Sequence, residues 1–417
     1  MTAEPTTKPT VSPHDPLPPE FFTVPPADPH QQNTQLRATC PVRRIDYPPG
    51  GEAYVVADYP TAFDAFSDPR LSKDPANAPA WFREALEHSS PVLIHHMLSA
   101  DPPRHTRLRK LVGRAFLPRQ IEQSRPRVQE ITDDLIDGFP GSGQVDLMEF
   151  ALALPMQVIC ELLGVPAGIR AQLHDWGVTI SGAPYPDEES NERLRLASEG
   201  IERFFLDLMR TRRGTLGAED LTSDILRVAR DGYTDEEVVS TLVLLIIAGH
   251  RTTANLIGNG IRALLLHPDQ LELLRSDPEL AASAVEEFLR YEPPVYRSTL
   301  RVATEDMTLG GVDIGKESFV HLMVDCANHD PAEFEDPDRL DITRQSNHHL
   351  AFGQGAHFCV GAPLSRIEGQ VAFPTLLRRL PGLSLAVPAD ELVWVSRNSP
   401  SRGLAALPVR YEHRLPR

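Results

Sequence analysis

Helical periodicity dominates the chain. Apolar positions recur every three to four residues in four long stretches, which predicts helices. These stretches are 127–139, 147–164, 191–211 and 234–266. Strand-like runs occur at 53–56, 299–302, 307–309 and 319–323, with Gly310-Gly311 as a turn between two of them. The pattern predicts a mainly α protein with a minor β-sheet region, in a single large domain.

The stretch that starts at Thr234 is the longest. Thr234 and Glu237 form a capping-box pair, and His267-Pro268 ends the periodicity. A helix of about 30 residues would span roughly 45 Å and cross the whole domain. Residues 242–247 are apolar on every side, which predicts burial. The polar residues 249–253 then suggest a functional kink, or alternatively a threonine hydroxyl bonded to the i−4 carbonyl.

Composition narrows the class of protein. The 417 residues are 41% hydrophobic and carry a formal net charge of −17, which argues against nucleic-acid binding. Four irregularly spaced cysteines indicate neither a disulfide framework nor paired zinc ligands. Residues 1–26 are polar and Pro-rich and are expected to form a flexible tail before a domain at 27–417. We found no signal peptide or membrane segment and expect a monomer in the cytoplasm.

Cys359 is the most informative residue. It lies in the run Phe352-Gly353-Gln354-Gly355-Ala356-His357-Phe358-Cys359-Val360-Gly361, directly before a helix-like stretch at 362–372 with Pro363 in its first turn. A helix N-terminus favours a thiolate, and the glycines allow the backbone to approach something large and flat. A structural cysteine or a catalytic nucleophile are the alternatives, but a cysteine hydrolase does not explain the flanking glycines.

This run resembles the haem-binding loop of the cytochrome P450 monooxygenases, and the resemblance extends over about residues 35–410. It implies a cytochrome P450 fold and haem b, with Cys359 as the axial thiolate ligand of the iron. It also implies that Phe352, Gly353, His357 and Gly361 surround the haem. Electrons would come indirectly from NAD(P)H, through a reductase and a ferredoxin.

The centre of the long helix resembles the family's oxygen-binding groove. The resemblance assigns catalytic positions to Ala248, Gly249 and Thr252, with Thr252 as the alcohol that passes protons. The next position departs from the pattern, because Arg251 replaces the usual carboxylate and an arginine cannot cycle a proton near neutral pH. Three explanations stay open: water with Thr252, a contribution from His250, or an Arg251 that binds an anionic group.

Basic residues match the family's haem-propionate partners. His105 and Arg109 lie at i and i+4 of one predicted helix, and Arg301 and His357 complete the set. Arg107, Lys110 and Arg114 fall on a different face, which is either a solvated surface or a dock for an acidic ferredoxin. The resemblance also implies a structural pair, Glu287 and Arg290, with Arg339 as its third member.

Substrate contacts are expected from variable segments. The residues are Leu98, Val243, Ile247, Ala248, Val295 and Ser399. Stretches 97–111, 285–294 and 349–366 are similar to actinobacterial enzymes that oxidise macrolides and related polyketides. We therefore expect a haem-thiolate monooxygenase that inserts oxygen from O2 into a hydrophobic natural product in antibiotic biosynthesis. The alternatives are epoxidation, oxidative coupling or peroxide-driven oxidation in the same fold, or haem binding without turnover.

Overall fold

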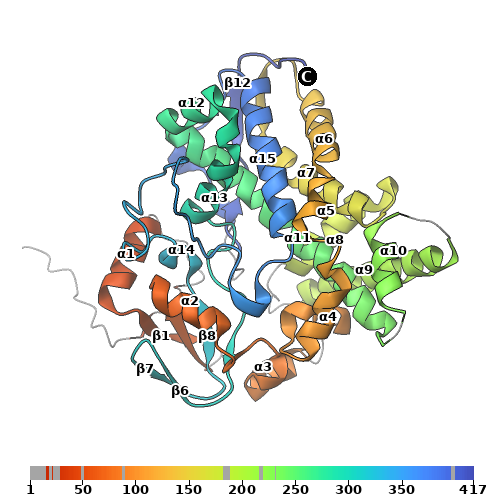
Figure 1. Ribbon diagram of the computed structural model, residues 1–417, viewed down its shortest axis with the longest axis vertical. Coiled ribbons are helices and arrows are strands. Elements are labelled where there is room, and N and C mark those ends of the chain that lie inside the picture. Colours follow the sequence, from red (N-terminus) through yellow and green to blue (C-terminus); the bar gives the residue numbers. More distant parts are fainter. Residues whose placement is uncertain are drawn as a thin grey trace, which may run out of the picture.

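The computed structural model describes residues 16–17, 21, 29–47, 51–86, 90–181, 188–215, 219–230, 232–395 and 400–417. Helices make up most of the molecule, and the main sheet lies to one side of them with α1 and α2 beside it (Figure 1). The predicted mainly α architecture is confirmed. Most of the tail expected at 1–26 lies outside the described residues. Leu17, within that segment, is buried and pairs with Ile45.

The helices follow the predicted periodicity closely. Their bounds are α1 Pro29–Thr39, α2 Tyr59–Ser67, α3 Ala80–Leu86, α4 Arg104–Gly113, α5 Pro118–Glu122, α6 Arg125–Asp137, α7 Leu147–Leu162, α8 Arg170–Ser181, α9 Glu188–Gly214, α10 Leu221–Val228, α11 Asp235–Leu266, α12 Pro268–Ser276, α13 Ala281–Tyr291, α14 Val324–Ala327 and α15 Ala362–Arg379. The four long stretches correspond to α6, α7, α9 and α11. The helix expected at 362–372 continues to Arg379 despite Pro374, because its apolar face packs against α6 and α13.

In the described part of the chain the strands form one main sheet and three small ones. Their bounds are β1 Val42–Tyr47, β2 Gly51–Val56, β3 Leu71–Ser72, β4 Gly143–Asp146, β5 Val302–Ala303, β6 Met307–Leu309, β7 Val312–Ile314, β8 Phe319–Leu322, β9 Ser384–Leu385, β10 Trp394–Val395, β11 Gly403–Leu404 and β12 Pro408–Tyr411. The main sheet has the order β1-β2-β8-β5-β3, with β2 and β8 parallel. Of the strand expected at 299–302, only Val302 is in a strand, the short β5. Upstream, isolated bridges at Val295 and Arg297 hold an extended segment instead.

Helix α11 runs through the core and packs against α7, α9 and α15. The predicted capping box is present, since Thr234 accepts from the N–H of Glu237 and the Glu237 carboxylate accepts in return. α11 is long and apolar enough to cross a membrane, but 72% of its apolar window is buried inside the protein, as expected for a core helix. The helix is continuous through residues 249–253, so the kink suggested by the polar residues does not interrupt it.

Candidate active site

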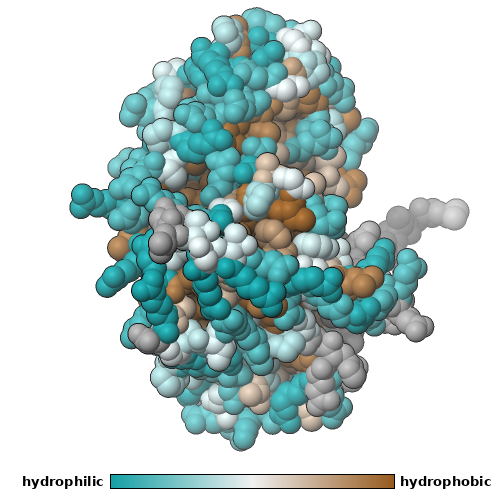
Figure 2. Space-filling model, turned by 90° about the vertical axis from the view of Figure 1, so that its right-hand side faces the viewer, coloured by the Kyte–Doolittle hydropathy of each residue, from teal (hydrophilic) through white to brown (hydrophobic). Residues whose placement is uncertain are grey.

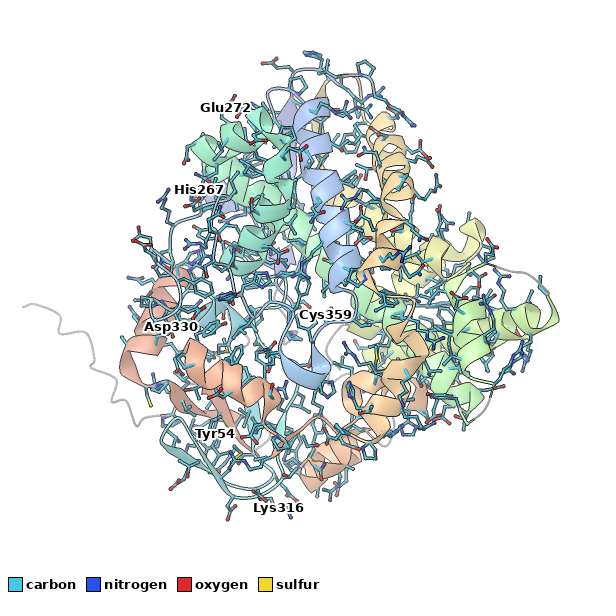
Figure 3. All side chains as sticks on the ribbon, viewed as in Figure 1. Tyr54, His267, Glu272, Lys316, Asp330 and Cys359 are labelled. Carbon is cyan, nitrogen blue, oxygen red and sulfur yellow. The ribbon has the colours of Figure 1, made fainter. Side chains whose placement is uncertain are left out.

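Cys359 lies near the centre of the molecule, in the loop that enters α15 (Figure 3). The loop is fixed by its own backbone, because the N–H of Cys359 donates to the carbonyl of Phe352 at 2.9 Å. Gly353 and Gly355 have φ values of 68° and 73°, which favour glycine. A Cβ on Gly355 would lie 2.5 Å from Oγ of Ser67. The two glycines therefore allow the tight turn that presents the thiol.

Cys359 is exposed to a cavity of about 270 Å³ between α4, α11 and the loop before α15. The cavity brings together most of the residues predicted for the site. The predicted residues that line it are Leu98, His105, Arg109, Ala248, Gly249, Thr252, Val295, Arg301, Phe352, Gly353, His357, Cys359 and Gly361. Four separate stretches of the sequence therefore meet at one site.

A few predicted residues lie elsewhere. Val243 is buried in the core and Ile247 packs against that core, whereas Leu244 and Leu245 are the aliphatic side chains of α11 that line the cavity. Ser399 lies outside the described residues. Arg251 is half-buried and does not line the cavity.

Two opposing effects act on the pKa of the Cys359 thiol. Burial raises its pKa, while the backbone N–H groups of Gly361 and Ala362 and the charges of Arg109 and Arg366 lower it. Burial outweighs the helix end, so the pKa of the thiol is raised overall. The predicted thiolate therefore requires a bound cation such as a metal, around which the N–H groups and arginines would stabilise the negative sulfur.

Five basic side chains meet at one end of the cavity: Lys73, His105, Arg109, Arg301 and His357. The ring centroids of His105 and His357 are 4.1 Å apart. Both ring nitrogens of His105 and Nε of Arg301 lack a hydrogen-bond partner among the described residues. Burial lowers the pKa of Arg301 to about 10 and, with its charged neighbours, that of His357 to about 2. Buried donors arranged in this way need an anionic partner.

His250 and Arg251 do not line the cavity. Nε2 of His250 lies 3.3 Å from Nδ1 of His174 in α8. Burial and then the charge of His174 lower the pKa of His250 to about 3, so the ring is neutral at neutral pH. The positive charge of Arg251 also acts on both histidines. His250 does not line the cavity and is neutral at neutral pH, so neither observation supports the suggested contribution of His250 to proton delivery.

Four polar side chains do line the cavity from α11 and α15: Thr252, Thr253, Ser365 and Glu368. The Thr252 hydroxyl donates to the carbonyl of Ala248 at 2.8 Å, which is the i−4 bond considered as an alternative to a kink. Thr253 donates to Ser365 Oγ at 3.3 Å and is also bonded to Glu368. Burial raises the pKa of Glu368 to about 8, and its Oε1 has no partner among the described residues. Sequence reasoning missed Glu368, although an acid within an apolar helix is a usable signal.

The expected structural pair, Glu287 and Arg290, is present, but its third member differs from the prediction. Glu287 and Arg290 are fully buried and share two hydrogen bonds of 2.8 Å. Arg344 donates to Glu287 at 3.2 Å, with a side chain only 11% exposed. Arg339, the predicted third member, is 63% exposed and offers only its backbone carbonyl to Arg290. Arg344 takes this position because the loop is held against α13 on both sides of it, where the N–H of Asp341 and the amide of Asn347 also donate to Glu287.

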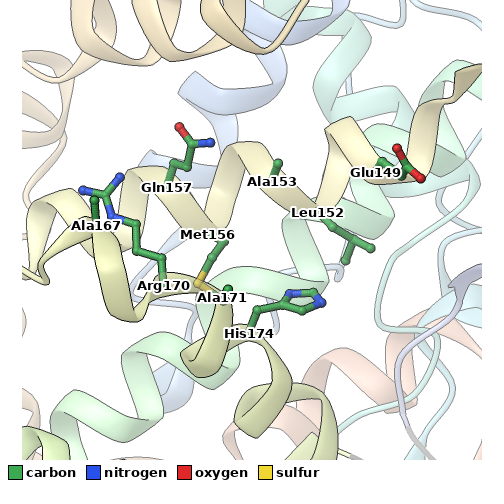
Figure 4. Close-up of a pocket in the computed structure, with 9 residues that line it drawn as sticks. All are labelled: Glu149, Leu152, Ala153, Met156, Gln157, Ala167, Arg170, Ala171 and His174. Atoms are coloured by element: carbon green, nitrogen blue, oxygen red, sulfur yellow. The ribbon is translucent and has the colours of Figure 1, made fainter. Parts of the chain in front are cut away.

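A second cavity of about 600 Å³ lies between α7 and α8. His174 projects from α8 into it, opposite Leu152 and Ala153 of α7 (Figure 4). The face of the molecule that carries α8, α9 and α10 is mostly hydrophilic, with apolar residues gathered near its middle (Figure 2). Cys359 does not line this second cavity, so the chemistry predicted from the sequence belongs to the first.

The residues at the first cavity fit a haem. A thiol suited to one metal position lies at one wall, and basic groups that need carboxylates lie at one end. The glycines at 249, 353 and 361 keep the space between these groups free of side chains. Iron at the thiol and propionates at the basic end would satisfy both sets of residues.

Comparisons with known proteins agree with this chemistry. The family model Cytochrome P450 matches residues 183–384. Cytochrome P450 monooxygenase PikC from Streptomyces venezuelae is 44% identical over 92% of this chain and 91% of that protein. The 6-deoxyerythronolide B hydroxylase of Saccharopolyspora erythraea is 42% identical over 91% of this chain and 95% of that protein. A solved structure, the P450 enzyme CxnD for C–S bond formation in chuangxinmycin biosynthesis, has a TM-score of 0.92 at 50% identity and covers 97% of this chain and 99% of that chain.

The chain belongs to the cytochrome P450 family. It has the fold of that family and is a haem-thiolate monooxygenase, an oxidoreductase. The predictions of fold, enzyme class and haem cofactor are confirmed.

Proposed function

We propose that this monooxygenase inserts oxygen from O2 into a polyketide or macrolide in a biosynthetic pathway, with Cys359 as the thiolate ligand of its haem. The observation that carries the proposal is the single cavity that joins Cys359 to an apolar wall from α11. Similarity to 6-deoxyerythronolide B hydroxylase supports the substrate class. The protein would act in the cytoplasm.

In this proposal, different residues of the cavity have different roles. Bound haem would supply dioxygen activation. Arg109, Arg366 and the N–H groups of Gly361 and Ala362 at the start of α15 stabilise negative charge on the Cys359 sulfur. Leu98, Leu244, Leu245 and Val295 exclude water and orient an apolar substrate. Thr252 positions its hydroxyl at the cavity wall through its bond to Ala248.

Glu368 takes the role of proton reservoir that Arg251 cannot fill. With a pKa raised to about 8 by burial, the carboxyl is largely protonated at neutral pH. It lines the same cavity as Thr252, and its Oε1 has no partner among the described residues. The Thr253 hydroxyl, which bonds both Glu368 and Ser365, holds the acid in place. A proton on Glu368 is thus available to a water beside Thr252.

Glu368→Gln should lower product formed per NAD(P)H consumed, on the order of 10²-fold for the loss of a general acid. Glu149→Gln, at an exposed position of α7, is the control and should leave the yield unchanged. The assay is product and NAD(P)H quantification at saturating substrate. A yield equal to that of the parent would refute the role.

The same variant has a second readout. Glu368 has a folded pKa of about 8 against an ordinary 4.5, so between these values the folded state binds the extra proton and stability falls as pH rises. Glu368→Gln should flatten that fall in melting curves recorded across the window. An unchanged pH dependence would show that the carboxyl titrates normally.

The proposed ferredoxin dock consists of cations on α4 and directly after its last residue. Lys110 and Arg114 are exposed, while His105 and Arg109 face the cavity, as the spacing predicted. Arg107 contributes less than expected, because it pairs with Glu237 and stacks over Tyr233 at 5.0 Å. An acidic ferredoxin supplied with electrons from NAD(P)H by its reductase would dock on the two exposed cations.

Lys110→Glu combined with Arg114→Glu should slow reduction by ferredoxin and remove most of its salt dependence, since surface charges mainly set association rates. Haem content should stay at the parent value. Arg203→Glu, exposed on α9, is the matched control. Stopped-flow reduction over a salt series is the measurement, and identical curves for the double variant and the parent would exclude this dock.

A second candidate function is oxidative C–S coupling. It is favoured by the 50% identity to CxnD, a P450 enzyme for C–S bond formation. Turnover under labelled dioxygen separates the two reactions. A product that contains labelled oxygen supports insertion, whereas a product that has lost two hydrogens and gained no label supports coupling. Absence of any product from macrolide substrates and from thiol-bearing ones, with a competent reductase and ferredoxin, would argue against both.

A further inference from the structure

Lys73 is a buried cation at the basic end of the cavity. It directly follows β3, and only 7% of the residue is exposed. Its side chain lines the same cavity as Cys359, and its ammonium donates to the hydroxyl of Thr299. Among the described residues it makes no ion pair. A buried ammonium whose nearest side-chain partner is a neutral hydroxyl is costly to keep.

The nearby carboxylate of Asp101 does not form an ion pair with the Lys73 ammonium. Asp101 acts on Lys73 electrostatically, but its oxygens accept bonds from the Ser72 hydroxyl and, at 2.9 Å, from the backbone N–H of Lys73. It also acts on Arg301 and His105. One carboxylate is thus shared among several basic groups, and its own hydrogen bonds hold it against the backbone.

The other charged group that acts on Lys73 is basic. Burial, then the charge of Arg301, places the pKa of Lys73 well below its ordinary value. Lys73 in turn is the largest charged contributor to the lowered pKa of His357. With Arg109, which also acts on His357, four permanent or potential cations (Lys73, Arg109, Arg301 and His357) share one carboxylate, that of Asp101. A ligand carboxylate placed among them would restore the charge balance and make each of these side chains less costly to bury.

We propose that Lys73 is a carboxylate-binding residue of the active-site cavity, whose ammonium pairs with a carboxylate of the molecule bound there. The inference deepens the proposed function and rests on it, since the cavity is the proposed haem site. Two sources share this chemistry: a propionate of the haem, or a carboxylate on the substrate. The position of Lys73 beside His105, Arg301 and His357 suits the first source, and its bond to Thr299, next to the extended segment at 295–298, suits the second.

The test compares Lys73→Met, which keeps the length of the stem without the charge, with Lys73→Arg, which restores a cation. Holoprotein showing the red-shifted Soret band of the carbon monoxide complex is prepared first. A parent without that band would refute the proposed function, not the role of Lys73. Haem loss is then followed by transfer to apomyoglobin, and binding of myristic acid and of its methyl ester is followed by Soret titration.

If the partner is a haem propionate, Lys73→Met should lose haem about 10- to 100-fold faster, the effect of losing one hydrogen bond to a charged group. Lys73→Arg should recover most of the parent rate. If the partner is a substrate carboxylate, haem loss should stay unchanged, and the preference for the acid over the ester should disappear in Lys73→Met and return in Lys73→Arg. Parent-like haem loss together with a parent-like response to both probes in Lys73→Met would overturn the proposal.

Discussion

Cys359→Ser should abolish the red-shifted Soret band that the reduced protein forms with carbon monoxide, and with it all monooxygenase turnover. The band reports a thiolate bound to iron, and a serine hydroxyl is too weakly acidic to replace it. The expected loss is complete, because Cys359 is the cysteine that lines the cavity beside Arg109. Absorbance of the reduced carbon monoxide complex is the measurement.

Two other cysteines provide controls in the same chain. Cys160 and Cys326 are buried away from the cavity, and burial raises the pKa of Cys160 to about 12 and that of Cys326 well above its ordinary value. Neither thiol is placed to ligate a metal, so Cys160→Ser and Cys326→Ser should retain the band. An intact band in Cys359→Ser, or its loss in either control, would contradict the assignment.

The parts of this site that could be predicted from the sequence are those whose spacing has one physical solution. The loop around Cys359 needs its glycines for left-handed turns, and Gly353 and Gly355 have those φ values. His105 and Arg109 at i and i+4 must share one helix face, and both reach the cavity. In each case local geometry alone determines where the residue points.

The orientation of α11 could not be predicted in the same way. A helix that is apolar on every side has no amphipathic face to indicate its rotation. Val243 and Ile247 were therefore as plausible as Leu244 and Leu245, and only the packing against α7 and α9 decides between them. Whether Arg251 lines the cavity depends on the same rotation, and it does not line it.

Lone polar residues were also beyond prediction. Lys73 lies in the polar stretch Ser72-Lys73-Asp74, where nothing local indicates burial. It becomes a cavity residue because β3 pairs with β5, a contact between segments far apart in the sequence. The choice of Arg344 over Arg339 has the same origin, since an irregular loop has no periodicity from which to predict which side chain turns inward.

Arg290→Met should destabilise the protein by about 3–5 kcal/mol, because it breaks a buried ion pair and leaves a charge behind. Arg290 also donates to the carbonyls of Asn328, Pro337 and Arg339 at 3.0, 2.7 and 3.0 Å, and these acceptors would be left unsatisfied. Total stability is typically about 5–15 kcal/mol, so the loss is a large share of it. Melting curves and the yield of folded, haem-containing protein are the measurements.

Matched variants separate a charge network from simple packing. Arg344→Met should be clearly destabilising, since its Nε bonds Glu287, whereas Arg339→Met, at a largely exposed side chain, should change stability by no more than about 0.5 kcal/mol. Glu287→Leu combined with Arg290→Met should cost less than the sum of the two single variants, because no unpaired charge remains. Stability losses that are strictly additive in the double variant, or an Arg339 variant as destabilised as the Arg344 variant, would contradict the charge network proposed here.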